Sequence, residues 1–192
     1  SARSTDTPRL AAGSWTYGGE CLVQWETPIS VEENEEVLAR LGTFPGVDAY
    51  YLTESFLGHR VWAADFLLPH SGTYLSQAKL NALKPTLFVS GREHANEVSS
   101  TSHILRLGEL LVTDSAYRSL LKKVNVVLHP MANPDGAALA YARQLVNPDH
   151  MLHAGRPGAL GSDATSGSSS PDPIYPESRA RGMIREAWLP DV

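Results

Sequence analysis

Cysteine is almost absent from the 192-residue sequence, which contains only Cys21. A single thiol excludes a disulfide within the chain and a metal site built from several cysteines. It leaves the cellular compartment open, because one cysteine fits both reducing and oxidising locations. No segment approaches the roughly 18 consecutive apolar residues that a membrane-spanning helix needs. The first residues also lack the basic and then apolar pattern of a signal peptide, so the sequence leaves the localisation unknown.

An excess of positive charge is absent as well. The sequence has 16 Lys and Arg against 21 Asp and Glu, a net charge of −5. No basic cluster carries interleaved aromatic residues, so a nucleic-acid partner is not expected. Apolar residues at 42% and charged residues at 19% are ordinary for a globular protein. The length suffices for one substantial core and is short for two domains.

The hydrophobic periodicity alternates between strands and helices. Ser30 and Glu33 form a capping box that predicts the start of the first helix. A strand, a helix and another strand in succession are typical of a parallel sheet. We therefore expect an α/β fold of three α/β/α layers around a mixed, largely parallel central sheet, incomplete at its C-terminus. The predicted strands are residues 21–25, 48–53, 60–68, 86–90 and 124–128, and the predicted helices are residues 30–41, 75–83, 97–112, 116–123 and 177–188.

Two segments have no such periodicity. Residues 1–18 are rich in small and polar residues and are expected to be flexible. Residues 145–178 are dominated by Gly, Ser, Pro and Asp, and a loop of this length is a functional lid or a disordered excursion. Residues 19–192 are accordingly predicted to form one domain that contains this loop.

The segment Thr86–Glu97 contains two candidate metal ligands. A short β-prone run ends at Gly91, and His94 and Glu97 follow it three residues apart. An imidazole nitrogen and a carboxylate oxygen are suitable ligands for Zn²⁺. If a helical turn follows the strand, both side chains project from one face and can share one ion. His-x-x-Glu alone is a weak motif, so its context has to support it.

A second marker follows the next strand, where residues 124–136 end in Asn133-Pro134-Asp135-Gly136. Together with His94 and Glu97, and with a Ser-x-x-Gly type turn at Ser55–Gly58 between two early strands, this sequence strongly resembles the zinc carboxypeptidase (carboxypeptidase A-like) family. The resemblance extends from about residue 30 to the C-terminus. It implies one Zn²⁺ ion held by His94 and Glu97, and hydrolysis of peptide bonds.

The resemblance also implies groups that the sequence does not contain. In the family a third ligand, a His, follows the Glu by about a hundred residues or more on a later strand, and a Glu on a still later strand is the general base. Both are expected beyond Val192, so no catalytic base is assigned within the chain. We expect these residues to be the N-terminal part of a catalytic domain that is inactive alone.

Substrate contacts are predicted at Asn96, Arg143 and Arg156. The family often has an Arg directly before the Glu ligand, and here that position is the neutral Asn96. Arg143 and Arg156 are the basic residues downstream, and Arg156 is the choice for an anion contact. The substrate class implied is a peptide or a small amide.

Several alternatives stay open. His150 and His153 are also three residues apart and are weaker candidates for the metal. Asp135 is either part of a turn or a carboxylate that orients a ligand His. The activity could instead be zinc-dependent deacylation of small acylated amino acids. The chain could also be a non-catalytic, carboxypeptidase-like binding module.

Overall fold

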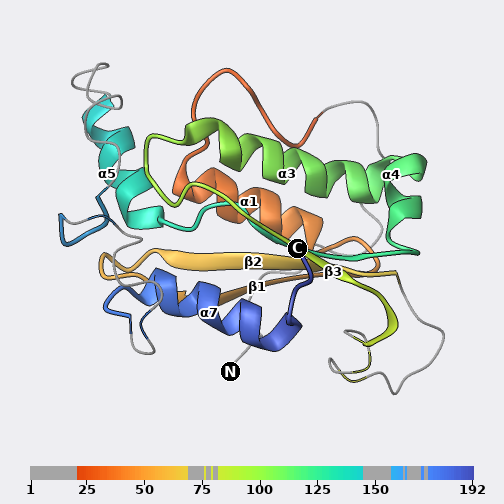
Figure 1. The fold of residues 1–192 in the computed structure, drawn as a ribbon. Helices are drawn as coiled ribbons and strands as arrows, with labels where there is room; N and C mark the ends of the chain where they lie inside the picture. The colour runs from red at the N-terminus through yellow and green to blue at the C-terminus, as the bar shows by residue number, and fades with distance from the viewer. Residues whose placement is uncertain are drawn as a thin grey trace.

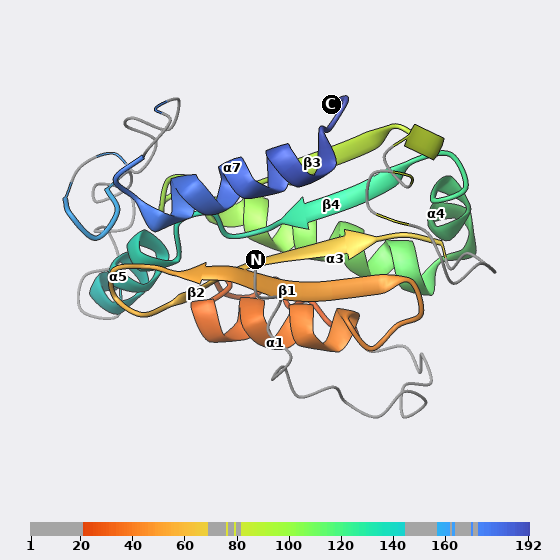
Figure 2. The ribbon, with the colours of Figure 1, turned by 90° about the horizontal axis from the view of Figure 1, so that it is seen from below.

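The computed structural model describes residues 21–68, 76, 79, 82–144, 157–161, 163, 170 and 173–192, with the backbone alone for residues 141–144. Its sheet contains four strands in the order β1-β2-β4-β3 (Figures 1 and 2). The strands are β1 (Val47–Glu54), β2 (Arg60–Phe66), β3 (Thr86–Ser90) and β4 (Asn125–His129).

Only one of the neighbouring strand pairs in the described residues is parallel. β3 pairs with β4 in parallel, whereas β2 is antiparallel to both β1 and β4. The prediction of a largely parallel sheet is therefore wrong for this part of the chain. β1 and β2 form a hairpin, and a short connection of this kind joins antiparallel strands. Gly58, with φ of 84°, takes the left-handed conformation in its turn.

Helices cover both faces of the sheet, so the predicted three layers are present. α1 (Val31–Leu41) and α3 (Val98–Thr113) lie on one face and α7 (Pro176–Trp188) on the other (Figure 1). The shorter α4 (Ser115–Leu120) and the helix α5 (Pro134–Gln144) lie at opposite ends of the α1 and α3 layer. No helix in the described ranges is long and apolar enough to cross a membrane.

Side chains of β2 point alternately to the two faces of the sheet, so this strand contributes to a hydrophobic cluster on each face. Trp62, Ala64 and Phe66 pack into the larger core beneath α1 and α3. Ala63 faces the opposite way and packs with residues of α7. Asp65 on that second face is buried, and its Oδ1 accepts hydrogen bonds from the Tyr50 hydroxyl (2.8 Å) and from Trp188 Nε1 (3.2 Å). The carboxylate thereby ties α7 to the hairpin.

Three further predictions need correction. Residues 21–25 form no strand, although Val23 is buried against the core. The apolar and β-prone residues 86–90 predict a central strand covered on both faces, whereas β3 lies at the edge of the described sheet and is only partly buried after its first residue. The Asn-Pro-Asp-Gly segment is not a simple turn, since α5 begins at Pro134. The predicted helix 75–83 lies mostly outside the described residues.

Candidate metal-binding site

The loop between β3 and α3 carries the predicted ligands and is fixed against the segment that follows β4. Gly91 N donates to His129 O (3.0 Å), and Ala132 N donates to Gly91 O (2.9 Å). Asn133 N then donates to Arg92 O (3.1 Å). The parallel pairing of the two strands thus continues past their ends. It brings the His-x-x-Glu and Asn-Pro-Asp-Gly segments side by side at the carboxyl edge of the sheet, where open α/β sheets place their sites.

Arg92 holds this loop from inside the protein. Its backbone has φ of 52°, which is uncommon for a residue with a side chain. The side chain is buried, and Nη1 donates to Ile29 O (2.6 Å) while Nε donates to Ala95 O (3.3 Å). Burial lowers the pKa of Arg92 to about 10, so the guanidinium stays charged at neutral pH. Arg92 is therefore a structural cation of the loop.

His94 and Glu97 point toward each other. His94 Nδ1 lies 2.6 Å from Glu97 Oε1, and the side chains are 12% and 48% exposed, so solvent reaches both. The turn that joins them is closed by Glu97 N donating to His94 O (3.1 Å), and α3 begins only at Val98. The pair therefore lies on a turn before the helix and not on a helical face. At this distance the two atoms share a hydrogen bond, and a zinc ion bound by both side chains would take the place of the shared proton.

Asp163 is a site residue that the sequence did not indicate. Its Oδ1 lies 3.3 Å from His94 Nε2, on the ring nitrogen that does not face Glu97. Ligand histidines of metal sites commonly direct their second nitrogen at a carboxylate. Asp163 comes from the Gly- and Ser-rich stretch and forms an isolated bridge with Pro157. No periodicity or spacing in that stretch could have singled it out. Among the described residues, no group of three or more His, Cys, Asp or Glu could hold a metal ion.

Asn133 caps the helix that follows β4. Its Oδ1 accepts from Gly136 N (2.8 Å), and Pro134 occupies the first helical position, where a missing N–H costs nothing. Its Nδ2 donates to Glu93 O (3.2 Å) in the ligand loop and to Pro157 O (3.3 Å). Gly136 is required because a Cβ there would lie 2.6 Å from Pro157 O. The Asn-Pro-Asp-Gly segment thus joins α5 to the ligand loop.

Asp135 ties the β1–β2 turn to the same edge of the sheet. Its fully buried carboxylate accepts hydrogen bonds from the Ser55 hydroxyl and from Leu57 N (3.1 Å). The alternative that Asp135 orients a ligand histidine is not favoured, because Asp163 lies beside His94. The Asp135 side chain therefore joins the Asn-Pro-Asp-Gly segment to the Ser-x-x-Gly turn.

Comparison with known proteins decides the family. Residues 37–164 match the family model described as zinc carboxypeptidase. This range contains both predicted ligands, the Asn-Pro-Asp-Gly segment and Asp163. The chain belongs to the zinc carboxypeptidase family. A search of curated proteins found no match.

Solved structures share the fold. A metallo-carboxypeptidase from Burkholderia cenocepacia matches 83% of this chain and 38% of its own, with a TM-score of 0.65 and 20% identity. A metallo-carboxypeptidase from Pseudomonas aeruginosa matches 85% of this chain and 38% of its own, with a TM-score of 0.63 and 21% identity. Carboxypeptidase A from Helicoverpa armigera has a TM-score of 0.57, 20% identity, and coverage of 82% and 42%. The chain thus spans about two fifths of the length of these zinc carboxypeptidase relatives.

The other predicted site residues are only partly placed. Asn96 is exposed on the turn between the two ligands. Arg143 lies in α5, where the backbone alone is described. Arg156, His150 and His153 lie outside the described residues, so the predictions for them remain predictions.

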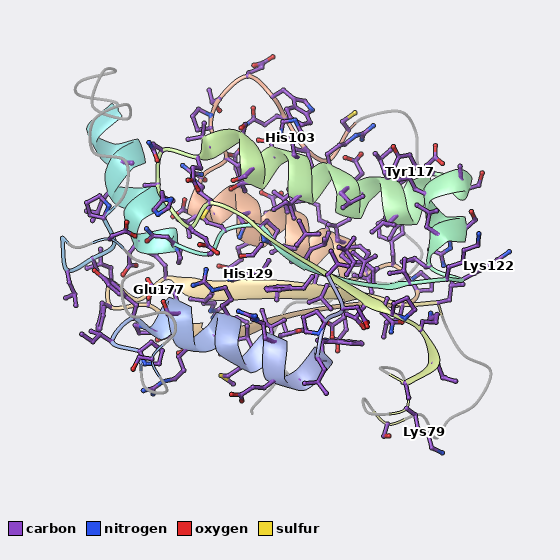
Figure 3. The ribbon with its side chains drawn as sticks, viewed as in Figure 1. Lys79, His103, Tyr117, Lys122, His129 and Glu177 are labelled. Carbon is purple, nitrogen blue, oxygen red and sulfur yellow. The ribbon has the colours of Figure 1, made fainter. Side chains whose placement is uncertain are left out.

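Two buried ionisable residues, His129 and Glu177, lie between the sheet and α7, on the face of the sheet opposite α3 (Figure 3). His129 is fully buried and its Nδ1 donates to Trp62 O (2.7 Å), as expected for a structural histidine. Burial lowers the pKa of His129 to about 4. Glu177, in the first turn of α7, is buried, and within the described part of the chain neither of its carboxylate oxygens has a hydrogen-bond partner. Burial, with a smaller contribution from the charge of Asp135, raises the pKa of Glu177 to about 7.

Proposed function

We propose that the chain supplies the first two metal ligands of a zinc-dependent metallocarboxypeptidase, His94 through Nδ1 and Glu97 through its carboxylate. The observation that carries the proposal is the 2.6 Å approach of His94 Nδ1 to Glu97 Oε1 on a solvent-accessible turn. A nitrogen and an oxygen donor at one point fit the ligand preference of zinc. Membership of the zinc carboxypeptidase family supports the choice of metal and of peptide-bond hydrolysis.

The residues around the ligands have separate roles in this proposal. With the metal ion on His94 Nδ1, the remaining ring proton would lie on Nε2 and face the Asp163 carboxylate. Arg92 fixes the loop from the core side. When bound, zinc polarises the carbonyl under attack and lowers the pKa of a bound water to about 7. Asn96, Arg143 and Arg156 are proposed to contact the peptide or small amide substrate.

Zinc titration tests the ligand assignment. We expect the 192-residue chain to bind one zinc ion weakly, because two protein ligands satisfy half of a tetrahedral sphere. His94→Ala and Glu97→Gln should each abolish measurable binding in a competition assay with a chromophoric chelator. His103→Ala is the matched control, because this exposed histidine lies on the outer face of α3 (Figure 3). Unchanged zinc affinity in His94→Ala would refute the assignment.

A second candidate activity is zinc-dependent deacylation of small acylated amino acids. The exposed, neutral Asn96 beside Glu97 favours it, because many family members have an arginine there that binds substrate. Substrate profiling of the full-length native protein would separate the two activities. Turnover of blocked dipeptides supports the carboxypeptidase, and turnover of N-acyl amino acids alone supports the deacylase.

A further inference from the structure

Glu93, the residue directly before His94, is held at both its backbone and its side chain. Its carbonyl oxygen accepts from Asn133 Nδ2 (3.2 Å). Its carboxylate forms an ion pair with Arg181 of α7, whose side chain is only 15% exposed. α7 lies on the face of the sheet opposite α3 (Figure 1). The ligand loop is therefore tied to an element on the far side of the sheet.

The surroundings of this ion pair make it stronger than an ordinary surface pair. The buried ring of His129 lies close enough for the charges of both Arg181 and Glu93 to act on it. Its Nδ1 donates to Trp62 O, and its Nε2 has no hydrogen-bond partner among the residues that the structure describes. The side chains of Arg181 and Glu93 are 15% and 34% exposed, so the pair is partly removed from water. Charges that are partly removed from water are screened less than exposed ones.

The ion pair complements the contacts that Arg92 makes. Arg92 anchors the loop toward Ile29 on the α1 and α3 side, and Glu93 anchors it toward α7. Two consecutive residues thus hold the backbone from both faces of the sheet immediately before His94. A shift of Glu93 moves the Cα of His94 directly, because the two share a peptide bond. Misplacement by about 1 Å is enough to impair a functional group.

We propose that Arg181 is a positioning residue for His94 and acts through its ion pair with Glu93. The inference rests on the proposed function, since it concerns the geometry of the metal ligand. Through Arg181, the first half of α7 helps to position the metal ligand in addition to packing on the sheet.

The test compares zinc affinity with folding stability in matched variants of the 192-residue chain. Arg181→Met keeps the length of the side chain and removes its charge, and Glu93→Gln removes the partner charge. We expect each to weaken zinc binding about 10- to 100-fold, as loss of an outer-shell partner does. The double variant should be no weaker than either single variant, because both remove the same interaction. Arg181→Lys should recover part of the affinity.

Arg60→Met is the control, because Arg60 forms a similar ion pair with Glu35 (2.9 Å) on the exposed surface of β2 and α1. It should leave zinc affinity unchanged. Folded Arg181→Met with wild-type zinc affinity would overturn the inference, as would a double variant whose loss equals the product of the single losses. If His94→Ala leaves zinc binding intact, His94 is not a metal ligand. That result would refute the proposed function and, with it, the positioning role of Arg181.

Discussion

His94 Nε2 lies 3.3 Å from Asp163 Oδ1, while Nδ1 of the same ring lies 2.6 Å from Glu97 Oε1, so a carboxylate faces each ring nitrogen. In the proposed site a zinc ion takes the place of the proton between Nδ1 and Glu97. The remaining ring proton then lies on Nε2, where it faces Asp163. The proposed ligand geometry therefore depends on a residue far along the chain in a stretch without periodicity.

Asp163→Asn should weaken zinc binding about 10- to 100-fold, because an amide fixes the histidine tautomer less firmly than a carboxylate. Competition with a chromophoric chelator measures the change. Glu186→Gln removes an exposed carboxylate on α7 and should leave the affinity unchanged. Equal affinities for Asp163→Asn and the wild type would show that the contact does not organise the ligand.

Asp135→Asn should destabilise the fold by about 1–3 kcal/mol, because the buried carboxylate accepts two hydrogen bonds from the hairpin turn. Ser55→Ala removes one of the two donors and should cost less. The two losses should not add, because the residues share one interaction. Urea unfolding of both single variants and the double variant measures this coupling. Strict additivity would contradict the link between the turn and the Asn-Pro-Asp-Gly segment.

Local sequence signals predicted most of the elements and a candidate ligand pair but not the contacts between distant segments. The capping box at Ser30 is present, and β3 has the predicted limits, because caps and apolar runs are local features. His94 and Glu97 could be proposed as ligands because strand, glycine and His-x-x-Glu spacing lie within twelve residues. The direction of β2 beside β4 was not predictable, since it depends on pairing across a long connection. Asp163 and Arg181 were missed for the same reason, because each acts on a segment remote in sequence.

Glu177→Gln should change how stability depends on pH. The folded pKa of Glu177 is raised to about 7, so its contribution to stability is full below the ordinary value of 4.5 and is lost as pH rises through 7. The loss amounts to about 3 kcal/mol for a shift of this size. The variant should therefore be more stable than the wild type at pH 8 and lose this advantage near pH 4.5. Urea unfolding of the wild type and Glu177→Gln across that range measures the difference.

His129→Asn should reveal a pH dependence of opposite sign. Burial lowers the folded pKa of His129 from 6.5 to about 4, so its contribution to stability is present above pH 6.5 and is lost as pH falls through 4. Asn preserves a donor for Trp62 O but cannot be protonated, so the variant lacks this loss of about 3 kcal/mol.

The gap in unfolding free energy between the wild type and His129→Asn should therefore narrow or reverse as pH falls from 6.5 to 4. The contribution of Glu177 is common to both proteins and cancels in their difference. Parallel curves for the wild type and His129→Asn would mean that the His129 ring is protonated in the folded protein as readily as in the unfolded chain.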